Sequence, residues 1–126
     1  MYKIIFYKDK NGNEPIKDFI DELERKGKTS KNDRIQYEKI RTYIDYLETQ
    51  GTNIGLPVVK HIEGKIWELR PLDNRIFFFC WQRNSFVMLH HFIKKTRKTP
   101  RKEIRQAKRN LENFIKIRSK EDDKNR

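Results

Sequence analysis

A dense run of positive charge lies between Lys94 and Arg109, where nine of the sixteen residues are Lys or Arg and only Glu103 is acidic. Such a segment is typical of proteins that bind phosphate backbones, because each cation that neutralises a phosphate releases condensed counterions. Six of these cations lie in or next to a helical pattern, and we expect them to contact a nucleic-acid phosphate backbone: Lys98, Arg101, Lys102, Arg105, Lys108 and Arg109. The alternative is a solvated cationic face with no partner.

Four further cations flank predicted strands: Arg70, Arg75, Lys94 and Lys95. RNA cleavage without metal needs fixed cations around the extra negative charge of the pentavalent transition state. Arg75 is the first choice for holding the scissile phosphate, since a guanidinium offers two parallel hydrogen bonds. The alternative is an exposed hairpin arginine. Because strand residues alternate between faces, only one of the two lysines is expected to face the sheet surface.

The remaining cation, Arg70, follows Glu68 by two residues and so shares its side of a strand. Its alternative role is an ion pair with Glu68 or Asp73. Glu68 itself is more suited to orienting an arginine than to acting as a general base, because neighbouring cations lower a carboxyl pKa.

Two adjacent histidines, His90 and His91, are the candidates for proton transfer, because imidazole titrates near neutral pH. Both lie in an apolar strand, where a buried, hydrogen-bonded histidine is the common alternative. His90 is taken as the catalytic candidate, and His61 is expected to be a loop residue.

The whole chain has 126 residues and a net charge of +12, which is unevenly distributed. Residues 1–59 carry 11 basic and 10 acidic residues, whereas residues 60–126 carry 19 and 8. The single cysteine, Cys80, stands in an aromatic strand and is expected to be a buried apolar residue. The sequence lacks the Cys/His spacing of a zinc site, a phosphate-binding glycine loop and a nucleophile–histidine pairing. No metal or cofactor is therefore expected. Without a secretory or membrane-spanning pattern, the protein is expected to be cytoplasmic.

Hydrophobic periodicity predicts the elements that must position these groups. Strands are expected at 2–8, 65–70, 75–82 and 86–94, with 58–61 as a short extended piece. Helices are expected at 15–26, from about 35 to 50, and from Pro100 onward. The last three strands predict an antiparallel meander. The fold class is α+β, with a small mixed, mainly antiparallel sheet, two N-terminal helices and a basic C-terminal helix. Residues 1–119 form one domain, and 120–126 form a charged tail.

Three motifs together resemble a known family: Lys60–Arg70, then Asn74–Phe79, then Leu89–Pro100. They are similar to the phage-derived, HigB-type branch of the RelE/ParE superfamily of bacterial toxins. The resemblance implies a RelE-like, microbial-RNase-like fold and a type II toxin that cleaves mRNA on the ribosome and so inhibits translation. It also implies a helix-turn-helix antitoxin of the HigA type, through which alone the toxin would meet operator DNA. Asn74 and His91 depart from the family's pattern.

Two other functions remain open on sequence alone. A nucleic-acid-binding protein without catalytic activity fits the charge asymmetry equally well. A protein that binds a membrane surface or an acidic partner explains the basic helix but leaves Arg70 and Arg75 without a purpose. An antitoxin could cover the cationic cleft, or it could dock on the nearly neutral N-terminal helices and block ribosome entry by bulk.

Overall fold

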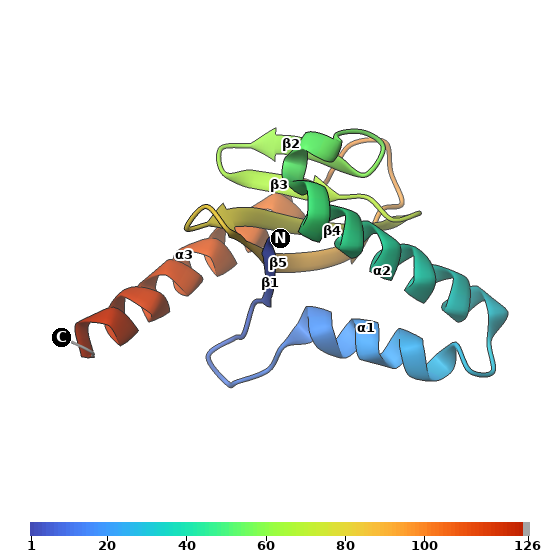
Figure 1. The fold of residues 1–126 in the computed structure, drawn as a ribbon, viewed down its shortest axis with the longest axis horizontal. Coiled ribbons are helices and arrows are strands. Elements are labelled where there is room, and N and C mark those ends of the chain that lie inside the picture. Colours follow the sequence, from blue (N-terminus) through green and yellow to red (C-terminus); the bar gives the residue numbers. More distant parts are fainter. Residues whose placement is uncertain (125–126) are drawn as a thin grey trace.

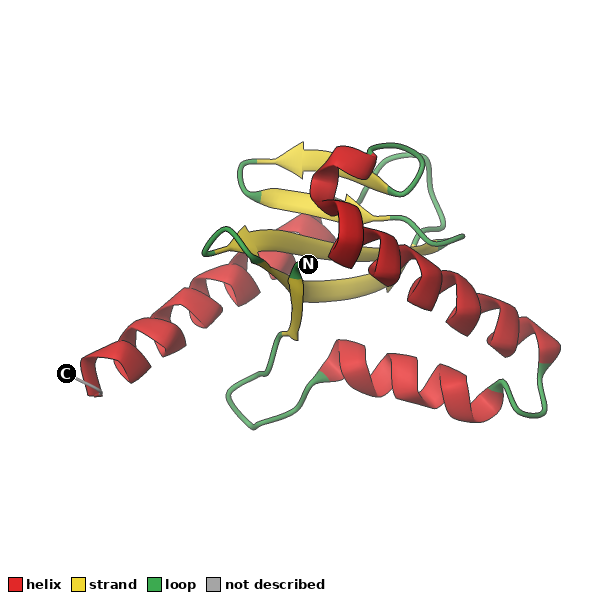
Figure 2. Ribbon diagram, viewed as in Figure 1, coloured by secondary structure: helices red, strands yellow, loops and turns green. Residues whose placement is uncertain are grey.

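The computed structural model describes residues 1–124, in which a five-stranded sheet is covered by helices on both faces (Figure 1). The strands are β1 (Lys3–Phe6), β2 (Val59–Glu63), β3 (Ile66–Leu69), β4 (Asn74–Trp81) and β5 (Ser85–Ile93). The helices are α1 (Pro15–Lys26), α2 (Lys31–Gln50) and α3 (Arg101–Lys124), with a short 3₁₀ turn, η1 (Gly51–Ile54), after α2. Figure 2 shows the same view coloured by secondary structure.

The sheet has the order β1-β5-β4-β3-β2, and only the β1–β5 pair is parallel. The predicted α+β class and the antiparallel meander of β3, β4 and β5 are therefore confirmed. The short extended piece is a full strand, β2, which pairs with β3. The sheet therefore has five strands, one more than the four predicted from the sequence.

The alternation of apolar residues divides the core between the two faces of the sheet. Ile76 and Phe78 of β4 pack with the apolar stripes of α1 and α2, whereas Phe77 and Phe79 pack under α3. A bulge in β5 opposite Phe77 and Phe78 interrupts the register, so that Met88 pairs with Phe78 and His90 with Phe77. The two histidines lie on opposite faces of the sheet because successive residues of a strand alternate.

The helix ends follow from local chemistry. Pro15 opens α1, where its missing N–H is not needed. Ser30 caps α2 by accepting a hydrogen bond from the Asp33 amide at 3.3 Å, so this helix begins earlier than the apolar stripe predicts. Helix α3 continues to Lys124, past the point where a charged tail was expected. The last two residues of that tail lie outside the described residues.

Two burial predictions fail. Cys80 is exposed, because it lies beyond Phe78 on the same sheet face, past the cover that α1 and α2 provide. Ile35 was assigned to the apolar stripe of α2 but is 45% exposed. Within the described residues, no helix is both long and apolar enough to cross a membrane.

Candidate phosphate-binding site

One end of the sheet, where β3 and β5 finish and β4 begins, gathers the cations predicted from the sequence. Arg70 and Arg75 line one concavity of about 290 Å³, here called the arginine pocket, whose wall is made by Lys39, Tyr43, Pro57, Arg70, Leu72 and Arg75. Lys94 and Lys95 line a second one of about 500 Å³, the lysine pocket. The backbone amide of Lys94 donates to the Asp73 carbonyl at 2.8 Å, which holds the two pockets at the same end of the sheet.

Arg75 is buried and 9% exposed, which differs from the exposed-hairpin alternative. Its Nη1 donates to the carbonyl oxygens of Leu72 at 2.6 Å and Asn74 at 2.9 Å. Its Nε lies 2.8 Å from Oε1 of Glu68, itself 1% exposed. Burial lowers the pKa of Arg75 from its ordinary value, while Glu68 raises it. The guanidinium is thus held by the turn that it lines, and Glu68 has the orienting role expected for it.

Several polar atoms beside the arginine pocket are buried without a hydrogen bond among the described residues. They are Nε of Arg70, Nε of Arg75 and Oε1 of Glu68. The Arg75–Glu68 contact is therefore an ion pair whose N–H is not aimed at the oxygen. A buried donor without a partner costs about 1–3 kcal/mol. An anion at the pocket would satisfy the arginine donors, which makes phosphate a natural ligand.

The turn between β3 and β4 carries backbone strain at Leu72, whose φ is 58°. A branched residue in the left-handed region costs about 1–2 kcal/mol. The strained turn presents the Leu72 carbonyl to Arg75. Such strain is often found at functional sites, where the surrounding structure maintains it.

The lysine pocket contains both Lys94 and Lys95, although strand alternation predicted that only one would face the sheet surface. The difference arises because β5 ends at Ile93, so the alternation no longer applies beyond it. Lys94 is partly buried and Lys95 is exposed. Lys102 and Glu103 of α3 complete the opposite wall.

The two histidines have different surroundings. Nε2 of His90 lies 3.4 Å from Oε1 of Glu103, and its ring stacks on Phe92 at 6.2 Å. Nε2 of His91 donates to Oδ1 of Asn74 at 2.9 Å, while its ring stacks on Phe19 of α1 at 4.0 Å. Burial, and then the neighbouring histidine, lower the pKa of His91 to about 4. His91 is thus a neutral packing residue at the wall of the lysine pocket, whereas His90 faces Glu103 and lines a different concavity.

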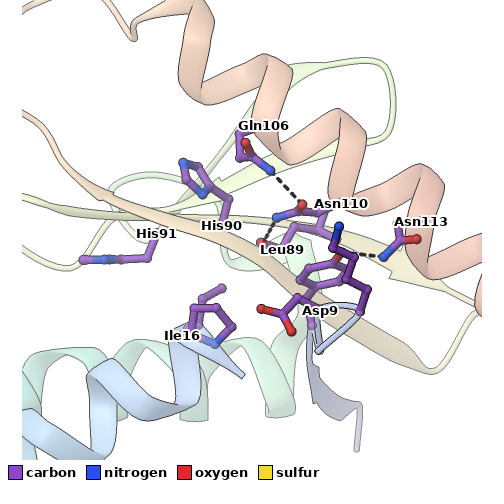
Figure 3. A pocket seen from close by; sticks show the side chains of 11 residues that line it. Asp9, Ile16, Leu89, His90, His91, Gln106, Asn110 and Asn113 are labelled. Carbon is purple, nitrogen blue, oxygen red and sulfur yellow. Dashed lines mark hydrogen bonds between the residues drawn. The ribbon is translucent and has the colours of Figure 1, made fainter. Parts of the chain in front are cut away.

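A third concavity, of about 590 Å³, lies at the open edge of β5 between α1 and α3 (Figure 3). Its amides are bonded to their neighbours: Asn110 Nδ2 donates to the Leu89 carbonyl at 2.8 Å, and Asn113 Nδ2 donates to the Tyr7 hydroxyl at 2.6 Å. These groups are satisfied within the chain. This pocket is therefore a weaker candidate for anion binding than the arginine pocket.

The six cations assigned to RNA contact are all exposed, but they are not equally free. Glu63 of β2 binds both Arg101, at 2.6 Å, and Lys108. Arg101 and then Lys108 hold the pKa of this carboxyl down at about 2. Arg109 donates to Gln106 at 2.7 Å. Among the described residues, Lys98, Lys102 and Arg105 form no ion pair, so they are the most available to a phosphate backbone.

Two pocket residues were missed from the sequence, Lys39 and Tyr43 of α2. Their spacing of four places both on one side of the helix. They lie among many other charged and aromatic residues of α2, and no local signal shows that this side meets the end of the sheet. His61 lies in strand β2, where it pairs with Trp67, and not in the expected loop; it is exposed and bonds the Gly64 carbonyl through Nε2 at 2.8 Å.

Residues 18–112 match the family model described as Phage derived protein Gp49-like (DUF891). The chain belongs to this family. Gp49-like proteins are associated with the toxins of toxin–antitoxin systems. Among curated proteins, none matches the chain. The matched range spans both pockets of the candidate site and stops within α3.

Proposed function

We propose that this Gp49-like protein is the toxin of a type II toxin–antitoxin system, with a RelE-like fold of the HigB type, and that it cleaves translated mRNA without a metal ion. The observation that carries the proposal is the presence of two cationic pockets at one end of the sheet, one of which has a buried donor, Nε of Arg70, without a hydrogen-bond partner among the described residues. The family's association with toxins supports the biological role.

In the proposed reaction, the scissile phosphate binds at the end of the sheet that carries both pockets, which share no lining residue. Arg70 donates to its oxygens, and Lys94 and Lys95 neutralise the charge that develops on the pentavalent phosphorus. Arg75 supports the site by fixing the turn and Glu68. The 2′-oxygen attacks phosphorus, the bond from phosphorus to the 5′-oxygen breaks, and a 2′,3′-cyclic phosphate forms beside a 5′-hydroxyl end.

His90 is the proposed group for proton transfer. It must accept the 2′-hydroxyl proton or supply the proton taken up by the departing 5′-oxygen. The Glu103 carboxylate at 3.4 Å can orient the ring. His91 is unsuited to this work, because it stays neutral and its Nε2 is bonded to Asn74.

The exposed face of α3 is the proposed anchor on ribosomal RNA. Lys98, Lys102 and Arg105 supply free cations, whereas Arg101 and Lys108 would first have to exchange Glu63 for phosphate. Several such contacts give strong sensitivity to salt.

A helix-turn-helix antitoxin is the proposed protein partner, and operator DNA would be contacted only through it. The α1–α2 hairpin projects from the sheet away from α3 (Figure 1), so an antitoxin bound on α1 would add bulk without covering the wall of the arginine pocket that α2 forms. Covering the pockets directly is the second route.

The test is to induce the protein in cells and map mRNA 5′ ends. Clusters of new 5′-hydroxyl ends within translated codons are expected. Ribosome occupancy without new ends would instead favour a nucleic-acid-binding protein that performs no chemistry.

A further inference from the structure

We infer that helix α2 supplies two ligands, Lys39 and Tyr43, to a phosphate bound in the arginine pocket. Arg70 and Arg75 come from the sheet end, and the helix forms the facing wall. The inference rests on the proposed function only in taking the phosphate to be that of RNA. It assigns to α2 a role in binding substrate that the sequence did not suggest.

The charge balance of the pocket favours an anion. Three of its six lining residues are cations, Lys39, Arg70 and Arg75, and no acid is among them. The Glu68 carboxylate, 2.8 Å from Nε of Arg75, is buried and already paired with that arginine. One buried donor, Nε of Arg70, has no partner among the described residues.

The geometry of α2 holds its two residues ready for such a ligand. Nζ of Lys39 lies 5.5 Å from the centre of the Tyr43 ring, a cation–π contact that restrains the flexible lysine. Neither the Lys39 ammonium nor the Tyr43 hydroxyl makes an ion pair or hydrogen bond within the described residues. Both are therefore free to donate to a phosphate oxygen. The backbone amide of Arg70 donates to the Val58 carbonyl at 2.9 Å, which fixes the opposite wall.

Inorganic phosphate is the probe, followed through the Nε–H NMR signals of the arginines. We expect phosphate to shift the Arg70 signal in the wild-type protein. Lys39→Met should weaken this binding about tenfold or more, since a charge-assisted hydrogen bond contributes about 1.5–3 kcal/mol. Tyr43→Phe should weaken it less, and Lys39→Arg should restore most of it.

The matched control is Lys31→Met, which removes the same charge from an exposed position of the same helix. It should bind phosphate as the wild type does. Thermal unfolding of each variant shows whether the fold is kept; Lys39→Arg tests the same ligand position if Lys39→Met unfolds. Equal phosphate binding by the wild type, Lys39→Met and Tyr43→Phe, or no shift of any arginine signal, would overturn the inference.

A ribosome assay separates the inference from the proposed function. Lys39-dependent phosphate binding without mRNA cleavage would leave the pocket assignment intact and remove the nuclease. Cleavage with an unchanged KM in Lys39→Met and Tyr43→Phe would leave the nuclease intact and remove α2 from the site.

Discussion

At the scale of single residues, the Arg75–Glu68 pair determines how the site can be probed. Removing one partner of a buried pair leaves a bare charge in the interior and costs about 3–5 kcal/mol. Arg75→Ala would test the phosphate-gripping role only on the assumption that the fold survives. The structure shows why that assumption is unsafe: the guanidinium is 9% exposed and holds the turn through Leu72 and Asn74.

We predict that Arg75→Ala and Glu68→Ala each lower the free energy of unfolding by about 3 kcal/mol. Urea denaturation measures this. Arg70→Ala, at a partly exposed position, should cost about 1 kcal/mol or less. A stability of Arg75→Ala equal to that of Arg70→Ala would contradict the structural role given to the pair.

His91 gives the protein a specific dependence on pH. Its pKa falls from 6.5 in the unfolded chain to about 4 in the folded protein, so the unfolded chain binds the proton first as pH drops. The contribution of His91 to the free energy of unfolding should be fully present above pH 6.5, and up to roughly 3 kcal/mol of it should be lost as pH falls to 4.

Denaturation curves between pH 7 and about 5.5 would measure the first part of this loss above the range in which carboxylates ordinarily titrate. His91→Gln should remove most of the slope, while His61→Gln, at an exposed position, should keep it. An unchanged slope in His91→Gln would show that another group causes the loss.

At the scale of elements, the Glu63 contact joins the β2–β3 hairpin to α3 and occupies two cations of the proposed RNA-binding face. Glu63→Gln should release Arg101 and Lys108 and so tighten RNA binding, with a steeper dependence on salt. Glu112→Gln is the control, because it changes the net charge of the protein by the same amount at an exposed position of α3. Filter binding at several salt concentrations measures both. Equal effects of the two variants would mean that only net charge matters.

Helices and strands with strong hydrophobic periodicity were predictable from the sequence. The placement of residues after a strand end, and the contacts between separate elements, were not. Helix α1 has the predicted bounds because Pro15 and Gly27 mark its ends. Lys94 and Lys95 share a pocket because β5 stops before them, which no alternation rule reveals. The arginines were found by their place at strand ends, whereas Lys39 and Tyr43 enter the pocket through the packing of α2 on the sheet.

At the scale of the whole molecule, the net charge is concentrated in residues 60–126, while the α1–α2 hairpin is nearly neutral. Proteins with such asymmetry meet phosphate backbones with one face and can present another face to a protein partner. The proposed division is RNA on the sheet end and α3, and antitoxin on the α1–α2 hairpin.

The division predicts which charges control RNA affinity. Each phosphate contact on a single strand contributes about 0.7 to the slope of log affinity against log salt. The double variant Lys102→Gln with Arg105→Gln removes two such contacts and should therefore make this slope shallower by about 1.4. Lys28→Gln with Lys31→Gln removes the same charge from the neutral half and should leave the slope unchanged. Similar slopes for both double variants would contradict a localised RNA face.

The most direct test is cleavage of a defined mRNA on purified, translating ribosomes, read as new 5′-hydroxyl ends. The wild-type protein should produce these ends within ribosome-covered codons, and Arg70→Ala should slow their formation about a hundredfold or more while remaining folded. Equal rates for folded wild-type and Arg70→Ala proteins, or no 5′-hydroxyl ends with either, would contradict phosphate cleavage at this end of the sheet.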